Sequence, residues 1–401
     1  MRVGQTVVAN RREVLDRKID VLVFLDVGMD PSTMIWAGAR LAPVQVCLWG
    51  HPTTTGMPHM DYFVSSDEYH ADAEALHTHT LAPIVAPVKK QALTETQMQT
   101  NSGGMLDYNV GSTWPHERFT EQLVLFQSLG FHFEKPGLGE GLSSPADLSN
   151  RDTAFYDRLA KGIEIEVVDK DTTGTAASPL TQGAISLRAL IKERSRGNSR
   201  LVLCPQHLPK LHPGLDKVFK GILDGSRTAK LVLVFDGSKK GQWRRTLERR
   251  WLPVLGKSLM KRVVWLDSLK PREYLALLAA GDVMVDPFPF GGGVTTLESL
   301  AVCTPVVTSP ALQSVPGLAA GMLRFLASKI PSSSSSYSSG AEILNGLVPT
   351  TVDEYISKVL QLLDPQSSLL ADIRTSVCSV KDELFSNDDA VDDWSNFLGR
   401  I

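Results

Sequence analysis

The sequence feature that most constrains the fold is an alternation of short apolar runs with longer amphipathic segments across residues 200–308. The runs have the length of a strand, and continuous apolar runs are typical of parallel strands covered on both faces. The segments between them suit helices, and the first opens at Pro213, since proline is best tolerated in the first turn. Strand and helix in alternation predict an α/β fold with a Rossmann-like lobe.

A second set of strands is predicted nearer the start of the chain, at residues 19–25, 43–49 and 61–65. Each ends in a polar turn with Gly, His, Ser or Asp, and open α/β sheets bind ligands at that end of their strands. These strands predict half of a doubly wound domain. A helix over residues 31–40 separates the first two, and we expect its buried side to consist of Ile35, Ala37, Ala39 and Leu41.

Changes in composition divide the chain into five parts. Stretches rich in Gly, Ser, Thr, Asn or Gln interrupt the pattern of strands and helices. The apolar pattern of a regular element returns at 119–126. Helices are predicted at 153–162 and 185–194, but they do not decide whether residues 137–199 form a linker or an insertion between lobes. The parts are a first Rossmann-like lobe at residues 1–136 with an insertion at about 70–118, a linker or insertion at 137–199, a second Rossmann-like lobe at 200–330, a Ser-rich loop at 331–340, and a helical section at 341–401 with helices at 352–363 and 369–397.

The 401-residue chain has a formal net charge of −3 and 43% hydrophobic residues, values that are ordinary for globular proteins. Its charge gives no broad basic surface, so we expect no nucleic-acid partner. No apolar run reaches the ~18 residues that a membrane span needs, and no signal-peptide pattern follows Met1. We therefore expect a cytoplasmic or nuclear protein that does not contact a membrane.

The four cysteines are spread along the chain without a paired spacing; they are Cys47, Cys204, Cys303 and Cys378. A zinc site normally shows closely spaced cysteines, and a disulfide framework belongs to small secreted proteins. We expect all four to be reduced residues of the core.

A glycine loop lies within residues 286–300, between a predicted strand and a predicted helix. In this geometry, unpaired backbone amides and the positive end of the helix dipole face an anion. Glu298, one turn into the helix, is placed to accept hydrogen bonds from ribose hydroxyls. The loop fits neither the Walker nor the dinucleotide pattern, so a plain glycine loop with an N-cap threonine is the alternative. Its residues are Gly291, Gly292, Gly293, Thr295 and Thr296.

Several motifs follow one another in a recognisable order. They are Ile-Asp-Val-Leu-Val at 19–23, Asp-Val-Gly-Met-Asp-Pro at 26–31, Arg-Leu-Ala-Pro-Val-Gln at 40–45, Gly-His-Pro-Thr-Thr-Thr-Gly at 50–56, Asp-Tyr-Phe-Val-Ser-Ser at 61–66, Cys-Pro-Gln-His-Leu-Pro-Lys-Leu-His-Pro at 204–213, Glu-Tyr-Leu-Ala-Leu-Leu-Ala-Ala at 273–280, the glycine loop, and Thr-Pro-Val-Val-Thr at 304–308. The set resembles the catalytic region of the O-linked N-acetylglucosamine transferase family, with its plant Spindly relatives and bacterial members. The Gly-His-Pro form is also similar to bacterial N-glucosyltransferases. The resemblance covers about residues 10–68, 119–136 and 200–328.

The resemblance implies a GT-B fold, in which two Rossmann-like lobes hold a nucleotide sugar in the cleft between them. It implies an inverting, metal-independent glycosyltransferase with no cofactor. The expected donor is a nucleotide diphosphate sugar, UDP-GlcNAc first among them, and the expected acceptor is a side chain of a polypeptide.

The resemblance also implies roles for single residues. Lys210 matches a lysine that contacts the donor diphosphate, and Thr295 and Thr296 match threonines that contact its phosphates. Gln206 matches a glutamine of the bacterial form. Glu298 stands where the family has a ribose-binding carboxylate, although the alignment shifts by one residue there.

A short segment ahead of the 271–280 helix matches the shelf that meets the uracil in this family. It begins at Leu269 and ends at Tyr274.

The chemistry of the reaction supports a role for Lys210 independently. Displacing a nucleoside diphosphate builds negative charge on the leaving phosphate, which a metal, or a lysine with helix-end amides, must stabilise. No Asp-x-Asp motif stands at a predicted strand end, so Lys210 with the glycine loop is the simplest answer. The alternative is a solvated lysine at the start of a helix.

His51 is the candidate catalytic acid or base, because it follows a predicted strand and a histidine titrates near neutral pH. A structural histidine bonded to backbone is the alternative. The remaining histidines of interest are weaker candidates, and we expect none of them to bind a metal. They are His70, His77, His79, His207 and His212.

The chain departs from the family in two respects. The strand, helix and His-containing loop that open the family's first lobe are not found ahead of residue 19, so we expect that lobe to be incomplete. No 34-residue repeat is found either. Either the chain is a fragment of a longer product, or another segment covers the gap in the first lobe. The missing front of that lobe motivates one alternative function, an inactive binding or scaffolding remnant. A glycosyltransferase with a non-protein acceptor is the other alternative.

Overall fold

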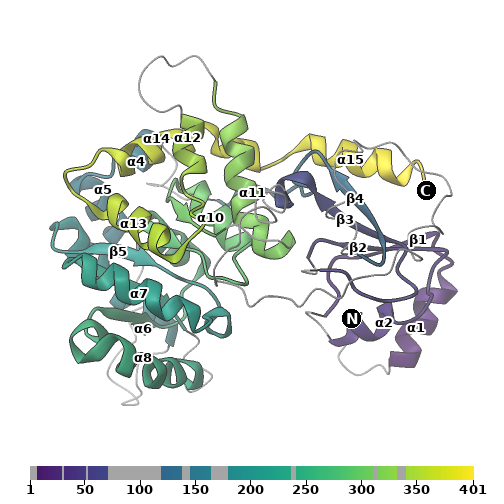
Figure 1. Ribbon diagram of the computed structural model, residues 1–401, viewed down its shortest axis with the longest axis horizontal. Coiled ribbons are helices and arrows are strands. Elements are labelled where there is room, and N and C mark those ends of the chain that lie inside the picture. The colour runs from purple at the N-terminus through teal and green to yellow at the C-terminus, as the bar shows by residue number, and fades with distance from the viewer. Residues whose placement is uncertain are drawn as a thin grey trace. The chain divides into compact units, whose positions relative to one another are not determined.

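The computed structural model describes residues 7–28, 31–50, 53–70, 119–137, 145–163, 179–235, 241–309, 314–331 and 340–401 (Figure 1). The chain forms two compact units. The first consists of Met1–Val64 and Asp72–Val124, and the second consists of Ser65–Ala71 and Leu125–Ile401. His51 and much of the predicted insertion, linker and Ser-rich loop lie outside the described residues.

The first sheet has the strand order β1-β2-β3-β4. β1, β2 and β3 pair in parallel, with Val23 opposite Val46 and Cys47 opposite Phe63. The middle of the sheet is buried because the apolar runs of β2 and β3 face a core on both sides. The elements that build it are α1 (Val7–Asp16), β1 (Val21–Phe24), α2 (Pro31–Ala37), β2 (Val44–Leu48), β3 (Tyr62–Ser66) and β4 (Gln122–Phe126).

The helix predicted at residues 31–40 is shorter than expected, because α2 ends at Ala37. Ala37 and Leu41 are buried as predicted. Ile35 is 46% exposed, so its place in the buried stripe was wrong. Leu41 lies beyond the end of α2, so its burial is not set by the helix periodicity that was expected to align it with Ile35, and Ala39 is half-buried.

The second sheet has the order β7-β6-β5-β8-β9, and its pairings are all parallel. From β5 the chain adds strands in one direction to β7, and then in the other from β8 to β9. The carboxyl ends of β5 and β8 therefore meet at a switch point, where open α/β sheets bind ligands. The elements are β5 (Arg200–Leu203), α7 (Gly214–Gly225), β6 (Ala229–Val234), α8 (Gln242–Met260), β7 (Val263–Leu266), α9 (Pro271–Ala280), β8 (Val283–Val285), α10 (Val294–Ala301) and β9 (Val306–Val307). The predicted Rossmann-like lobe is confirmed.

Further helices lie outside the two sheets; most of them pack around the second sheet, whereas α15 packs through Trp394 and Phe397 against Phe126 of β4 (Figure 1). α13 packs against α7, where Gly221 and Gly225 leave room for Ile356 and Leu360. α11 was not predicted from the sequence, and its described side chains are largely buried. The helices are α4 (Pro145–Ser149), α5 (Thr153–Lys161), α6 (Pro179–Ser195), α11 (Ser314–Ser328), α12 (Gly340–Asn345), α13 (Val352–Leu363), α14 (Leu369–Val380) and α15 (Asp388–Leu398), with short 3-10 turns at η1 (Asp67–Tyr69), η4 (Leu208–Lys210) and η6 (Lys381–Leu384).

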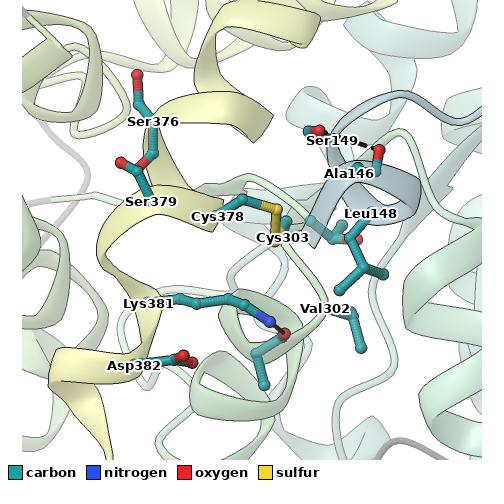
Figure 2. The surroundings of a disulfide bond; sticks show 12 residues. Ala146, Leu148, Ser149, Val302, Cys303, Ser376, Cys378, Ser379, Lys381 and Asp382 are labelled. Atoms are coloured by element: carbon teal, nitrogen blue, oxygen red, sulfur yellow. Dashed lines mark hydrogen bonds between the residues drawn. A yellow bond between two sulfur atoms is a disulfide. The ribbon is translucent and has the colours of Figure 1, made fainter. Parts of the chain in front are cut away.

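The expectation that all four cysteines are reduced was wrong, because Cys303 and Cys378 form a disulfide. Figure 2 shows this bond between the turn after α10 and α14, with Lys381 nearby. Packing of α14 near α10 joins residues that are 75 positions apart, which a search for paired spacings does not detect. Cys47 and Cys204 are free and buried, as predicted.

No helix in the described part of the chain is both long enough and apolar enough to cross a membrane.

Candidate functional site

The candidate donor site lies in the second unit, at the switch point of the β7-β6-β5-β8-β9 sheet. The segment after β5 supplies Gln206 and Lys210, and the segment after β8 supplies the glycine loop and the start of α10. Because β5 and β8 are neighbours, these two segments, 81 residues apart at Lys210 and Gly291, come together.

Lys210 ends the 3-10 turn η4 and is half-buried. Its Nζ donates to the backbone oxygen of Gly291 at 3.0 Å and approaches Oε1 of Gln206 at 3.4 Å. The ammonium also lies 4.8 Å from the centre of the Phe290 ring. Burial lowers the pKa of Lys210, and the charge of Asp286 opposes that shift. The lysine therefore faces the glycine loop and is not a solvated lysine at a helix start.

Gln206 joins the two segments of the site. Its side chain is 2% exposed, and its Nε2 donates to Oγ1 of Thr295 at 2.5 Å. Oε1 of the same amide faces Lys210. One buried amide thus connects the predicted phosphate-binding lysine with the predicted phosphate-binding threonine.

Two glycines of the loop, Gly291 and Gly292, leave no room for a side chain. A Cβ on Gly291 would lie 2.6 Å from Oδ2 of Asp286, and a Cβ on Gly292 would overlap both Gln206 and Thr295. The amide of Gly292 donates to Oδ1 of Asp286 at 2.7 Å. This amide therefore faces the protein interior, whereas the sequence analysis expected the loop amides to face an anion.

The start of α10 supplies the remaining donors. Thr296 is buried, its Oγ1 donates to the backbone oxygen of Gly292 at 3.1 Å, and its amide bonds to Gly293. The amides of Val294 and Thr295 precede the first bonds of the helix, so they can donate to an anion. The half-buried Thr295 is better placed than Thr296 to offer a hydroxyl. A direct contact of either threonine with phosphate stays a prediction.

Three residues predicted to meet the nucleoside lie on α9, α10 and the segment before α9. Tyr274 donates from its hydroxyl to the backbone oxygen of Pro205 at 3.3 Å. Burial raises the pKa of Tyr274, and the nearby carboxylate of Glu298 adds to this effect. Burial also raises the pKa of Glu298. Leu269 is half-buried just ahead of α9. Their roles in binding uracil and ribose stay predictions.

The structure does not test the catalytic role of His51, which lies outside the described residues. Two other histidines have local partners: Nε2 of His70 lies 2.9 Å from Oγ of Ser65, and Nδ1 of His212 accepts from the amide of Gly214 at 3.1 Å. His207 is exposed. Among the described residues, no three His, Cys, Asp or Glu side chains gather as a metal site would require.

Asp286, the first residue of the stretch 286–300 that holds the glycine loop, was given no role from the sequence. Its carboxylate is 1% exposed and also accepts from Thr308 at 2.8 Å. A charged residue directly after a buried strand was the available signal.

The fold is similar to that of a solved mutant of the Thermobaculum terrenum O-GlcNAc transferase, with a TM-score of 0.61 and 20% identity. The match covers 100% of this chain and 56% of that one. The chain has the GT-B fold. It thus spans little more than half the length of that relative, and at this identity the likeness shows the fold alone.

Weaker matches to solved structures include two other proteins. A UDP-forming trehalose-phosphate synthase from Burkholderia xenovorans has a TM-score of 0.48 and 11% identity, over 98% of this chain and 80% of that one. Anabaena HepE with UDP and glucose has a TM-score of 0.37 and 15% identity, over 54% and 52%. No protein-family model matches the chain, and neither does any curated protein sequence.

Proposed function

We propose that the chain is an inverting, metal-independent glycosyltransferase that moves a sugar, N-acetylglucosamine, from a nucleotide diphosphate sugar to a protein side chain. The observation that carries the proposal is the convergence of Lys210, Gln206, Gly291 and Thr295 at the switch point of a GT-B fold. The named activity of the Thermobaculum terrenum relative supports the choice of sugar and reaction.

The proposed reaction needs stabilisation of negative charge on the departing diphosphate. When a donor binds, Nζ of Lys210 keeps its bond to the Gly291 oxygen and donates a further hydrogen bond to a phosphate oxygen. The amides at the start of α10 and the hydroxyl of Thr295 donate to the same group. Preorganised donors of this kind typically contribute about 10²- to 10³-fold each in rate.

The acceptor side of the reaction rests on the sequence alone. We assign His51 the role of taking the proton from the acceptor hydroxyl as its oxygen attacks the anomeric carbon. Attack on the face opposite the leaving diphosphate inverts the configuration at that carbon. No separate cofactor is required by this scheme.

The proposal is tested by titrating the protein with UDP-GlcNAc, UDP-glucose and GDP-fucose in a calorimeter. We expect one of them to bind wild type, Lys210→Ala to lose this binding, and Lys217→Ala, which removes an exposed lysine of α7, to keep it. No affinity for any uridine or guanosine diphosphate sugar would count decisively against the proposal.

The acceptor class needs a second measurement. Mass spectrometry of co-expressed proteins should show peptides that gain the mass of an N-acetylhexosamine with wild type and not with Lys210→Ala. Donor hydrolysis without modified peptides would favour a non-protein acceptor. Donor binding without hydrolysis or transfer would favour an inactive scaffold.

A further inference from the structure

The peptide group between Gly291 and Gly292 has both of its polar ends engaged. Its N–H, on Gly292, donates to Oδ1 of Asp286 at 2.7 Å. Its carbonyl, on Gly291, accepts from Nζ of Lys210 at 3.0 Å. The orientation that Asp286 imposes on this peptide therefore decides which way the carbonyl points, and hence where the lysine rests.

Asp286 is itself held firmly and out of reach of any ligand. Its side chain is 1% exposed, and its second oxygen accepts from Thr308 at 2.8 Å. Its backbone oxygen accepts from the hydroxyl of Tyr355 on α13 at 2.9 Å. The other titratable groups that face it are Lys210 after β5 and Cys204 at the end of β5. The carboxylate lies behind the loop, so it acts on a donor only through the loop.

We propose that Asp286 is a positioning residue of the donor site, which fixes the Gly291–Gly292 peptide and through it places Lys210 for the diphosphate. The inference rests on the proposed function for the identity of the ligand. The two hydrogen bonds are the essential part of the role, since they set the orientation of the peptide. The negative charge is not essential to that role and opposes the approach of an anion.

This division of roles makes asparagine a revealing replacement. In Asp286→Asn, Oδ1 still accepts from Gly292, and Nδ2 donates to Thr308 once that hydroxyl turns to act as acceptor. Both contacts persist and the charge is lost. In Asp286→Ala both contacts are lost, and the amide of Gly292 has no acceptor in the interior.

The charge predicts how donor binding depends on pH. Burial raises the pKa of Asp286 to about 6, against the hydrogen bonds from Gly292 and Thr308 and the charge of Lys210. Below this value the carboxyl is neutral, and its O–H can donate a hydrogen bond to the Thr308 oxygen while the Gly292 amide still donates to Oδ1. A bound diphosphate is then no longer repelled, so affinity rises as the pH falls through the pKa.

Calorimetric titration with UDP-GlcNAc at pH 5.5 and 7.5 tests the inference, because the diester phosphates of this ligand do not titrate in that interval. For wild type we expect binding about threefold or more tighter at pH 5.5. Asp286→Asn should bind at least as tightly as wild type at pH 7.5 and lack this pH dependence. At both pH values, Asp286→Ala should bind UDP-GlcNAc at least about tenfold more weakly than wild type. Equal affinity of the alanine variant and wild type would overturn the inference, and so would an asparagine variant as weak as the alanine variant.

Amide hydrogen exchange provides a reading that needs no ligand. In wild type and Asp286→Asn, peptides covering residues 286–296 should exchange slowly, whereas Asp286→Ala should exchange faster there and not in β6. Identical exchange in all three proteins would refute the positioning role. If wild type binds no nucleotide sugar but the three proteins differ in exchange as described, the proposed function is refuted, whereas the role of Asp286 in placing the loop stands.

Discussion

Asp286 makes stability depend on pH at the scale of a single residue. Its carboxyl titrates near 3.8 in the unfolded chain and at about 6 in the folded protein, because burial disfavours the charged form. Between these values the folded state holds a proton that the unfolded state has lost, so the free energy of unfolding falls as pH rises.

We therefore predict that wild type loses about 2 kcal/mol of unfolding free energy relative to Asp286→Asn between pH 4.5 and pH 7. Urea unfolding of both proteins at the two pH values measures this difference. A difference that grows in the opposite direction would show that the carboxyl ionises more readily in the folded protein than in the unfolded chain.

Gly292 offers a second test at the residue scale. A methyl group there overlaps Gln206 and Thr295, whereas one on Gly293 meets only the flexible end of Leu318, at 3.3 Å. We expect Gly292→Ala to weaken nucleotide binding by about tenfold or more, and Gly293→Ala to change it by less than about threefold. Titration with UDP distinguishes the two. Equal losses of affinity would mean that a side chain anywhere in the loop weakens binding, whether or not it overlaps Gln206 and Thr295.

At the scale of elements, the disulfide ties α14 to the turn after α10. In the same region, Nζ of Lys381 donates to the Ala301 oxygen at 2.6 Å (Figure 2). Closing a loop of 75 residues stabilises a fold by about 2–4 kcal/mol. We predict that Cys303→Ser and Cys378→Ser each lower the unfolding free energy by this amount. Dithiothreitol should lower the unfolding free energy of wild type and leave that of either variant unchanged. Alkylation of both thiols in unreduced protein would show that the bond does not form.

The contact between α7 and α13 depends on two glycines. A Cβ on Gly221 would lie 2.5 Å from Cδ1 of Ile356, so we expect Gly221→Ala to cost about 1–3 kcal/mol of stability. Gly162, at the end of α5, meets only ordinary contacts at 3.6 Å, and Gly162→Ala should change stability by less than about 0.5 kcal/mol. Thermal unfolding of both variants measures this difference in stability. Equal stabilities would show that α7 and α13 can move apart without cost.

Elements with a strong local signal were predicted well from the sequence. The helix predicted at 352–363 is α13, where Thr351 and Glu354 form a capping box. The strands of the second sheet were found because each contains a short apolar run. Two features were missed because they depend on distant packing. The cysteines pair only because α14 lies near α10, and Asp286 acquires its role only when Gly292 folds back onto it.

At the scale of the molecule, the described candidate donor residues all belong to the second unit, whereas His51 belongs to the first. Binding and transfer should therefore be separable. We predict that His51→Ala keeps the affinity for UDP within about threefold of wild type and lowers sugar transfer by about 10²- to 10⁴-fold. Titration and a radiolabelled transfer assay measure the two effects, and unchanged transfer would remove His51 from the mechanism.

The central claim is that the loop from Gly291 to Thr295 and the ammonium of Lys210 hold a diphosphate. The most direct measurement is a crystal structure of the protein with UDP. We predict density for both phosphates at the start of α10, with a phosphate oxygen within hydrogen-bond distance of Nζ of Lys210. UDP bound elsewhere, or a Lys210 ammonium that contacts no phosphate oxygen of the bound nucleotide, would contradict this prediction.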